Sequence, residues 1–225
     1  MPQVPIAVAI ANTIEGEIIS GQRPPGERLV EREIATRFRV SSIPVREALQ
    51  ILETRGLVIK RINRGCSVID LSPEEMAQMS ELRDWLEPKV MEWAACRRTE
   101  EGLAELRARL ERLRLAAESG NYARFFACDL DFHRCIWELA GNPPAARTLI
   151  TVVGCLFACG LRNASVDSRQ QYLKHERLFR SIADSRPADA ALLLADISAG
   201  FRGQLSRSST NKPASDRSSN RPPSR

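Results

Sequence analysis

Residues 41–46 combine hydroxyls, a proline and an arginine in an order that suits the start of a helix in contact with nucleic acid. Ser41 or Ser42 can cap such a helix, because a hydroxyl satisfies its free N–H groups, and Pro44 is tolerated in a first turn. The same N-terminus attracts phosphate through its N–H groups and dipole. Arg46 projects from the first turns, where its guanidinium can fork onto guanine O6 and N7 or onto a phosphate. The predicted chemistry is recognition of double-stranded DNA.

Two short helices and a hairpin must position these side chains. An amphipathic helix beginning at Leu29 comes first, and the helix that carries Arg46 follows after a tight turn. Residues 57–60 and 66–69 alternate between apolar and polar side chains, as in two strands of a hairpin. Helix, turn, helix and basic hairpin together predict a winged helix-turn-helix domain in residues 1–70.

Three further residues of this domain have a position and a chemistry suited to DNA. Arg32 opens the first of the two helices and can reach the same groove. Arg64 and Gly65 form the hairpin tip, where glycine lets the backbone approach DNA closely. The alternative is that these arginines only form a solvated face. The predicted DNA-binding residues are Arg32, Ser41, Ser42, Arg46, Arg64 and Gly65.

A second domain begins at Ser72-Pro73-Glu74-Glu75, which has the pattern of a capping box with proline in the first turn. Apolar periodicity then predicts helices over roughly 73–97, 100–118, 122–140, 144–163, 169–185 and 187–205. No strand pattern follows residue 70, so the expected fold is mainly α, with an all-α antiparallel helical bundle over residues 71–206. Residues 207–225 lack apolar periodicity and are predicted to form a disordered basic tail.

Charge and cysteine usage narrow the class of protein. The chain has 225 residues and a net charge of +5. Residues 1–70 hold 10 Lys and Arg against 8 acids, and residues 206–225 hold 5 against 1, so only the ends are basic. The 6 cysteines show neither CxxC pairs nor disulfide-like spacing, which indicates reduced, mostly buried thiols. Without a signal-peptide pattern or a long apolar run, the expected location is the cytoplasm, with no membrane association.

The N-terminal motifs together resemble the DNA-binding domain of the GntR family of transcription regulators. The matching motifs are Ser20-Gly21, Pro25-Gly26-Glu27-Arg28-Leu29, Glu31, Ile34-Ala35, Val40-Ser41, Pro44-Val45-Arg46-Glu47-Ala48-Leu49, Leu52, Gly56-Leu57-Val58 and Arg64-Gly65. This resemblance implies a ligand-responsive transcription regulator, a homodimer on a palindromic operator, rather than an enzyme. One departure is Ser42, where the family usually has arginine. The absence of that arginine removes a charged contact with DNA and puts the family's usual operator sequence in doubt.

The C-terminal motifs resemble the FCD ligand-binding domain of the FadR-type subfamily. They are Glu81-Leu82-Arg83-Asp84-Trp85-Leu86-Glu87-Pro88, Asp129-Leu130-Asp131-Phe132-His133-Arg134, Ala140-Gly141-Asn142-Pro143 and His175-Glu176. Many such domains hold a divalent metal through one aspartate and three histidines, which implies Asp129, His133 and His175 as ligands here. Asp129 and His133 are four residues apart and share a helix face. The third histidine would fall near Gly200, so the site is expected to be incomplete, with open positions and weakened affinity for Zn, Ni or Mn.

The effector expected from this resemblance is a small organic acid. A metal-free pocket is the alternative to the metal site, and there Arg83, Arg134 or Arg162 would fork onto the acid. Each of these arginines equally suits an ordinary surface ion pair. Two other functions fit single features of the chain: a metal-dependent hydrolase using the Asp129, His133 and His175 centre, and a non-specific architectural DNA binder using the basic tail. The effector, the operator and the choice between repression and activation are not encoded in any motif.

Overall fold

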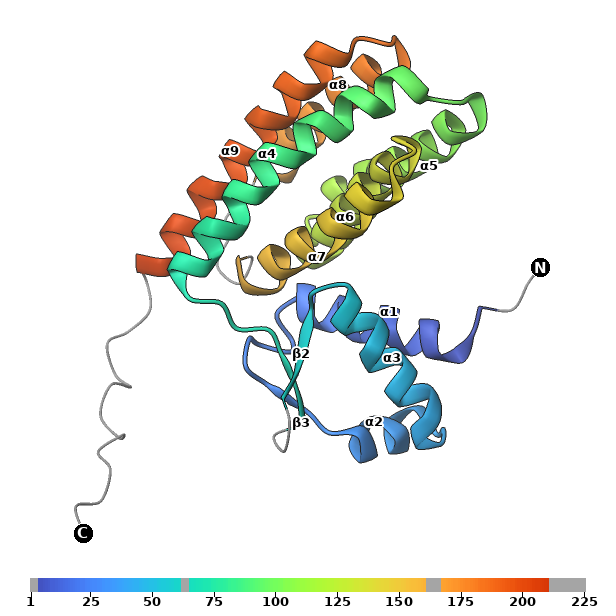
Figure 1. Cartoon of the computed structure of the whole chain (residues 1–225), viewed down its shortest axis with the longest axis vertical. Helices are drawn as coiled ribbons and strands as arrows, with labels where there is room; N and C mark the ends of the chain where they lie inside the picture. Colours follow the sequence, from blue (N-terminus) through green and yellow to red (C-terminus); the bar gives the residue numbers. More distant parts are fainter. Residues whose placement is uncertain (1–3, 62–64, 161–166, 211–225) are drawn as a thin grey trace.

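A computed structural model describes residues 4–61, 65–160 and 167–210, with side chains described for all of these except 160 and 200–210. These residues form two domains, a small one that contains every strand of the described ranges and a larger bundle of long helices (Figure 1). Within the described ranges, no helix has the length and apolar character needed to cross a membrane.

The N-terminal domain is a winged helix-turn-helix built on three helices and one sheet. Its helices are α1 (Ile6–Ile19), α2 (Glu31–Phe38) and α3 (Ser42–Thr54), and its strands are β1 (Arg28–Leu29), β2 (Val58–Arg61) and β3 (Gly65–Val68). The sheet is antiparallel with the order β1-β3-β2, and Leu29 pairs with Cys66. The buried aliphatic side chains of α1 and α3 meet over this sheet, so the apolar periodicity of the sequence is satisfied in one core.

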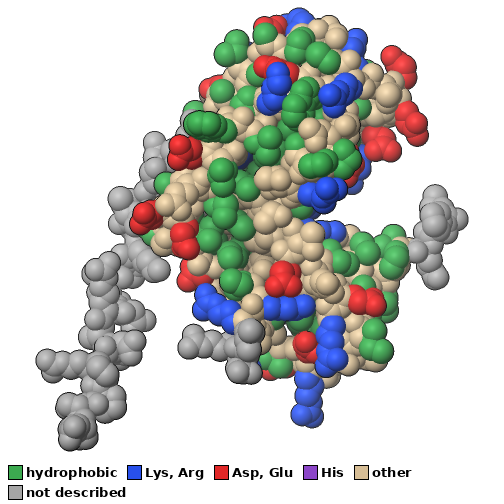
Figure 2. Space-filling view, viewed as in Figure 1, with side chains coloured by type: hydrophobic (Ala, Val, Ile, Leu, Met, Phe, Trp, Pro, Cys, Tyr) green, Lys and Arg blue, Asp and Glu red, His purple; other side chains and the backbone are tan. Residues whose placement is uncertain are grey.

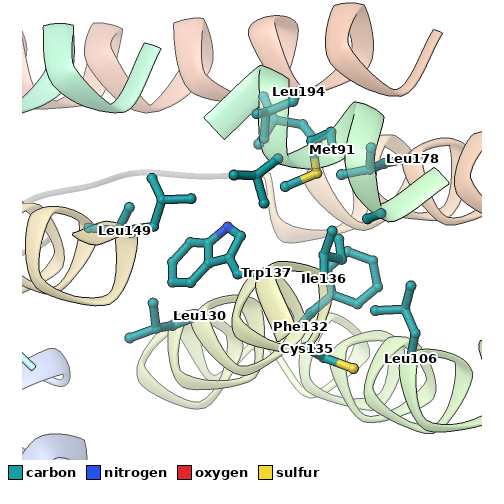
Figure 3. Packing of buried hydrophobic residues seen from close by; sticks show 14 of the residues in the cluster. Met91, Leu106, Leu130, Phe132, Cys135, Ile136, Trp137, Leu149, Leu178 and Leu194 are labelled. Carbon is teal, nitrogen blue, oxygen red and sulfur yellow. The ribbon is translucent and has the colours of Figure 1, made fainter. Parts of the chain in front are cut away.

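The C-terminal domain shows six helices in the part of it that the structure describes. They are α4 (Pro73–Arg97), α5 (Glu100–Glu118), α6 (Tyr122–Leu139), α7 (Pro143–Gly160), α8 (Ser168–Ala183) and α9 (Pro187–Thr210). Ser72 and Glu75 form the capping box at the start of α4, as the sequence predicted. The core surrounds Trp137 of α6, which is fully buried, and Figure 3 shows Met91, Leu130 and Leu149 around its ring.

Three local expectations differ from the structure. Arg28–Leu29 forms a short strand, and the helix expected from Leu29 begins at Glu31, because these two residues pair with β3. Ser41 is the N-cap of α3, but its hydroxyl accepts no capping hydrogen bond. The last helix continues to Thr210, beyond the expected end at 205, so residues 207–210 of the predicted tail are helical. The remainder of that tail, 211–225, lies outside the described residues.

The two domains meet where the end of α3 contacts α7. Thr151 Oγ1 donates a hydrogen bond to the Thr54 carbonyl oxygen at 2.9 Å, and Cys155 Sγ lies 3.2 Å from the Gly56 carbonyl oxygen. At Gly154 a Cβ would overlap the carbonyl oxygen of Arg55, so only glycine allows this approach. The end of the helix that carries Arg46 is therefore in backbone contact with the larger domain.

Candidate nucleic-acid interface and metal centre

Helix α3 has one buried face and one face that is open to solvent. Val45, Ala48, Leu49 and Leu52 are fully buried, whereas Ser42, Ile43, Arg46, Glu47 and Gln50 are exposed. Because buried and exposed residues alternate with helical periodicity, packing fixes the exposed face in one direction. This face is available to enter the major groove of DNA.

The guanidinium of Arg46 is oriented by the neighbouring helix α2. Its Nε lies 2.8 Å from Glu31 Oε2, and 66% of the Arg46 side chain and 40% of the Glu31 side chain are exposed. An exposed ion pair contributes about 0–1 kcal/mol to stability, so Glu31 can release the guanidinium at little cost when DNA binds. At the same end of α3, the Ser41 hydroxyl makes no capping bond, which leaves it available as a phosphate donor.

The other predicted DNA-binding residues lie on α2 and on the hairpin. Arg32 is exposed on α2, and Gly65 is exposed at the start of β3 with φ of +80°, a conformation that favours glycine. Arg64 lies outside the described residues. Figure 2 shows Lys and Arg side chains at the end of the molecule that carries α2, α3 and the hairpin. The exposed Lys60 and Arg61 of β2 add positive charge there.

Asp129, His133 and His175 come together in the interior of the larger domain. His175 Nε2 lies 2.5 Å from Asp129 Oδ1 and 3.2 Å from His133 Nε2, while His133 Nε2 lies 3.8 Å from Asp129 Oδ1. All three residues are buried, and their ligand atoms lie within 4.8 Å of one another. The structure thus brings together, from α6 and α8, the three ligands expected from the sequence.

The outer nitrogens of both imidazoles make contacts that determine where the ring protons reside. His133 Nδ1 lies 3.0 Å from Glu87 Oε1, and His175 Nδ1 lies 2.8 Å from the Gln171 carbonyl oxygen. Both partners are acceptors, so each Nδ1 carries the proton and donates it. In the neutral rings both Nε2 lone pairs then face each other beside the Asp129 carboxylate. Such a set of acceptors requires a shared proton or a cation between them, and it fits a divalent metal.

The electrostatics of the cluster favour a charged carboxylate at both acids. Burial alone would raise the pKa of Glu87, but the charges of Arg83 and His133 and their hydrogen bonds lower it to about 2. Burial also opposes ionisation of Asp129, and the charge and hydrogen bond of His175 lower its pKa below the usual value. The same interaction raises the pKa of His175, although burial alone would lower it. Both carboxylates therefore offer negative charge to a cation.

The three arginines predicted to bind an effector lie in different surroundings. Arg83 is buried, and its Nε donates to Glu87 Oε2 at 2.5 Å, so it adjoins the His133 side of the cluster. Arg134 pairs with Glu15 of α1, with 2.7 Å between Nη2 and Oε1, instead of joining the three ligands. Arg162 lies outside the described residues, and the side chains around Gly200 in α9 are likewise not described.

Sequence reasoning missed the residues that support the cluster. Glu87 accepts hydrogen bonds from both His133 and the Trp137 indole, the latter at 3.0 Å, and it is completely buried. The available signal was the i, i+4 spacing of Arg83 and Glu87, which places both side chains on one face of α4. The Gln171 contact uses a backbone carbonyl, which side-chain patterns do not reveal.

Comparison with known proteins agrees with this architecture. Residues 78–199 match the FCD domain model, and residues 6–68 match the model of bacterial regulatory proteins of the gntR family. The chain belongs to the GntR family. Its larger domain is accordingly the FCD effector-binding domain, and its smaller domain is the DNA-binding domain of a transcriptional regulator.

Relatives of this GntR-family protein are named as regulators. It is 32% identical over 139 residues to the HTH-type transcriptional repressor RspR of Escherichia coli, covering 62% of this chain and 61% of that protein. It is 26% identical over 181 residues to the HTH-type transcriptional regulator YdhC of Bacillus subtilis, covering 79% and 81%. The solved structure of E. coli McbR/YncC shares the fold, with a TM-score of 0.77 and 20% identity over 92% of this chain and 99% of that one.

These matches decide between the function classes that the sequence left open. Both domains and the named relatives are those of transcriptional regulators and not of enzymes, so the hydrolase interpretation has no support. The Asp129, His133 and His175 cluster lies within the region that matches the FCD domain model.

Proposed function

We propose that this GntR-family regulator binds a palindromic operator as a homodimer, and that a small carboxylate bound beside a metal at Asp129, His133 and His175 controls its DNA affinity. The observation that supports the site most strongly is the convergence of three acceptor atoms, with both Nδ1 protons held on the outside by Glu87 and Gln171. A divalent cation placed between the two Nε2 lone pairs and the Asp129 carboxylate would bind all three acceptors at once.

Each residue around the centre has a distinct task. Asp129 supplies negative charge, and the two imidazoles supply neutral nitrogen ligands. Glu87 fixes the ring orientation of His133 and is itself held by Arg83 and by the Trp137 indole. A divalent cation bound there would supply a Lewis-acidic centre whose remaining coordination positions accept carboxylate oxygens. The buried positive charge of Arg83 adds to the attraction for an anionic effector.

Calorimetric titration of the EDTA-treated full chain with Zn²⁺, Ni²⁺ and Mn²⁺ tests the metal site. Asp129→Asn should weaken binding at least about tenfold because it removes a charged ligand, and Glu87→Gln should weaken it about 10–100-fold through the orientation of His133. Asp131→Asn is the matched control, since Asp131 lies on the same helix but pairs with Arg112 outside the cluster, at 2.8 Å. Equal affinity of Asp129→Asn and Asp131→Asn would refute the metal site.

The effector part of the proposal has its own test. A library of small mono- and dicarboxylates is added to the zinc-loaded protein bound to fluorescent operator DNA, and anisotropy reports release or tightening. One carboxylate should change the affinity, and Asp129→Asn should abolish that change while the effector-free affinity is retained. A change that persists in Asp129→Asn would place the effector elsewhere in the protein.

An exposed apolar surface on the larger domain supports the dimer. Trp85 and Leu82 lie three residues apart on α4 with 80% and 56% of their surface exposed, and Leu192 of α9 is 71% exposed. Figure 2 shows hydrophobic side chains along the face formed by α4 and α9. Large exposed aromatic residues are enriched in protein interfaces, so a second copy of the chain is the partner we infer for this face. Two winged-helix domains would then read two half-sites.

A further inference from the structure

Ile43 is an exception among the aliphatic residues of the recognition helix α3. Val45, Leu49 and Leu52 are fully buried, whereas 65% of the surface of Ile43 is exposed. A single exposed aliphatic residue is ordinary on a protein surface, so its position on the helix decides what it means.

The position of Ile43 is the first turn of α3, two residues after the N-cap Ser41. It precedes Arg46 by three residues and Gln50 by seven, and all three are exposed, so they form one line along the open face of the helix. The preceding residue, Ser42, is short and uncharged, which leaves the isoleucine unshielded at this end. The first turn of this open face thus carries an exposed apolar side chain.

The major groove of B-DNA offers one distinctly apolar group to a protein, the 5-methyl group of thymine. Contact between this methyl and the isoleucine side chain would remove both from water, whereas cytosine, adenine and guanine have no methyl group in the major groove. We propose that Ile43 is a specificity-determining residue that contacts the 5-methyl group of a thymine in each operator half-site. The inference rests on the proposed operator binding and names one of the bases that it reads.

The expected effect follows from the size of the group that is buried. Burial of one methyl-sized group contributes about 0.8 kcal/mol, which corresponds to about a fourfold change in affinity per half-site. Hydrogen bonding is not involved, so the effect depends on the methyl group alone and not on the Watson–Crick identity of the base.

The contact between Ile43 and a thymine methyl can be tested by removing single methyl groups from the operator. The full chain first selects its operator from a random duplex library, and each thymine is then replaced in turn by deoxyuridine, which lacks only the methyl group. For the unmutated protein, one thymine per half-site should lose about fourfold in affinity. For Ile43→Ala, replacing that same thymine should have no effect, because the contact is already absent. A double-mutant cycle of this kind cancels any general loss of affinity in the variant.

Ile6→Ala is the matched control, because Ile6 is 53% exposed but belongs to α1. It should retain the full sensitivity to deoxyuridine. Equal responses of the unmutated protein and Ile43→Ala at every thymine would overturn the inference while leaving operator binding intact. If the library yields no selected sequence, specific operator binding fails first, and the base contact fails with it.

Discussion

Replacement of Gly154 by alanine should destabilise the protein through the contact between its domains. A Cβ at Gly154 would lie well inside 3.0 Å of the Arg55 carbonyl oxygen, and that oxygen belongs to the backbone at the end of α3. No rotamer change can relieve an overlap with backbone atoms, so α7 and the end of α3 must move apart. That movement also lengthens the contacts of Thr151 and Cys155 with the same loop.

Two opposing contributions determine how much stability Gly154→Ala loses. Alanine is a better helix former than glycine, which favours the variant by about 0.5–1 kcal/mol in the interior of α7. Overpacking of a tight interface costs about 1–3 kcal/mol. The overlap involves backbone on the opposite side, which favours the upper half of that range, so we expect a net loss of about 1–2 kcal/mol in the free energy of unfolding.

Urea unfolding followed by circular dichroism measures this loss, and small-angle scattering reports whether the domains separate. Gly16→Ala is the matched control, because Gly16 lies inside α1 with no atom within 4 Å of the added Cβ. In this control only the higher helix propensity of alanine acts, so the free energy of unfolding should rise by about 0.5–1 kcal/mol. If Gly154→Ala is as stable as Gly16→Ala with an unchanged radius of gyration, the reasoning about the domain contact is wrong.

Three further predictions concern DNA binding, assembly and pH. Arg46→Ala should weaken specific operator binding by about 1–3 kcal/mol per half-site in a gel-shift titration, and footprinting at unchanged affinity would contradict its role. Trp85→Asp should shift the protein towards a monomer of 25.1 kDa in sedimentation, because it charges the apolar face; a persistent dimer would exclude this face. Burial alone would raise the pKa of Glu17, but the hydrogen bonds and charges of Arg37 and Arg23 outweigh burial and hold this pKa below its usual value of 4.5. The resulting stability is present above pH 4.5 and disappears as the pH falls through the folded-state pKa, so Glu17→Gln should flatten the acid side of the stability profile.

Local patterns were sufficient to predict the elements that carry the site. The apolar spacing of α3 determines which residues are buried, and Arg46 must then face outwards. Asp129 and His133 share a face of α6 because they are four residues apart. His175 was expected beside them only through the family resemblance, and the approach of Glu87 from α4 was not predictable, because the relative placement of α4, α6 and α8 depends on the packing of the whole bundle.

The direction of the Arg134 side chain, in contrast, already follows from helix geometry. Successive residues of a helix point about 100° apart, so Arg134 cannot share the inward direction of His133. It contacts Glu15 on α1 instead. The strand at Arg28–Leu29 was missed for a different reason: two residues are too few for a period-2 pattern, and only pairing with β3 creates the strand.

The position of Arg134 links the buried cluster to the recognition helix. His133 and Arg134 are consecutive residues of one rigid helix, so a displacement of one moves the other. Glu15 pairs with Arg134 and also with Arg55, which is the C-cap of α3. The two ion pairs of Glu15 therefore connect α6 with the residue that caps the end of the recognition helix. Because the Arg55 carbonyl also lies against Gly154, the ion pair with Glu15 and the backbone contact with α7 involve the same residue, and substitutions at Glu15 and Gly154 should show non-additive effects on stability.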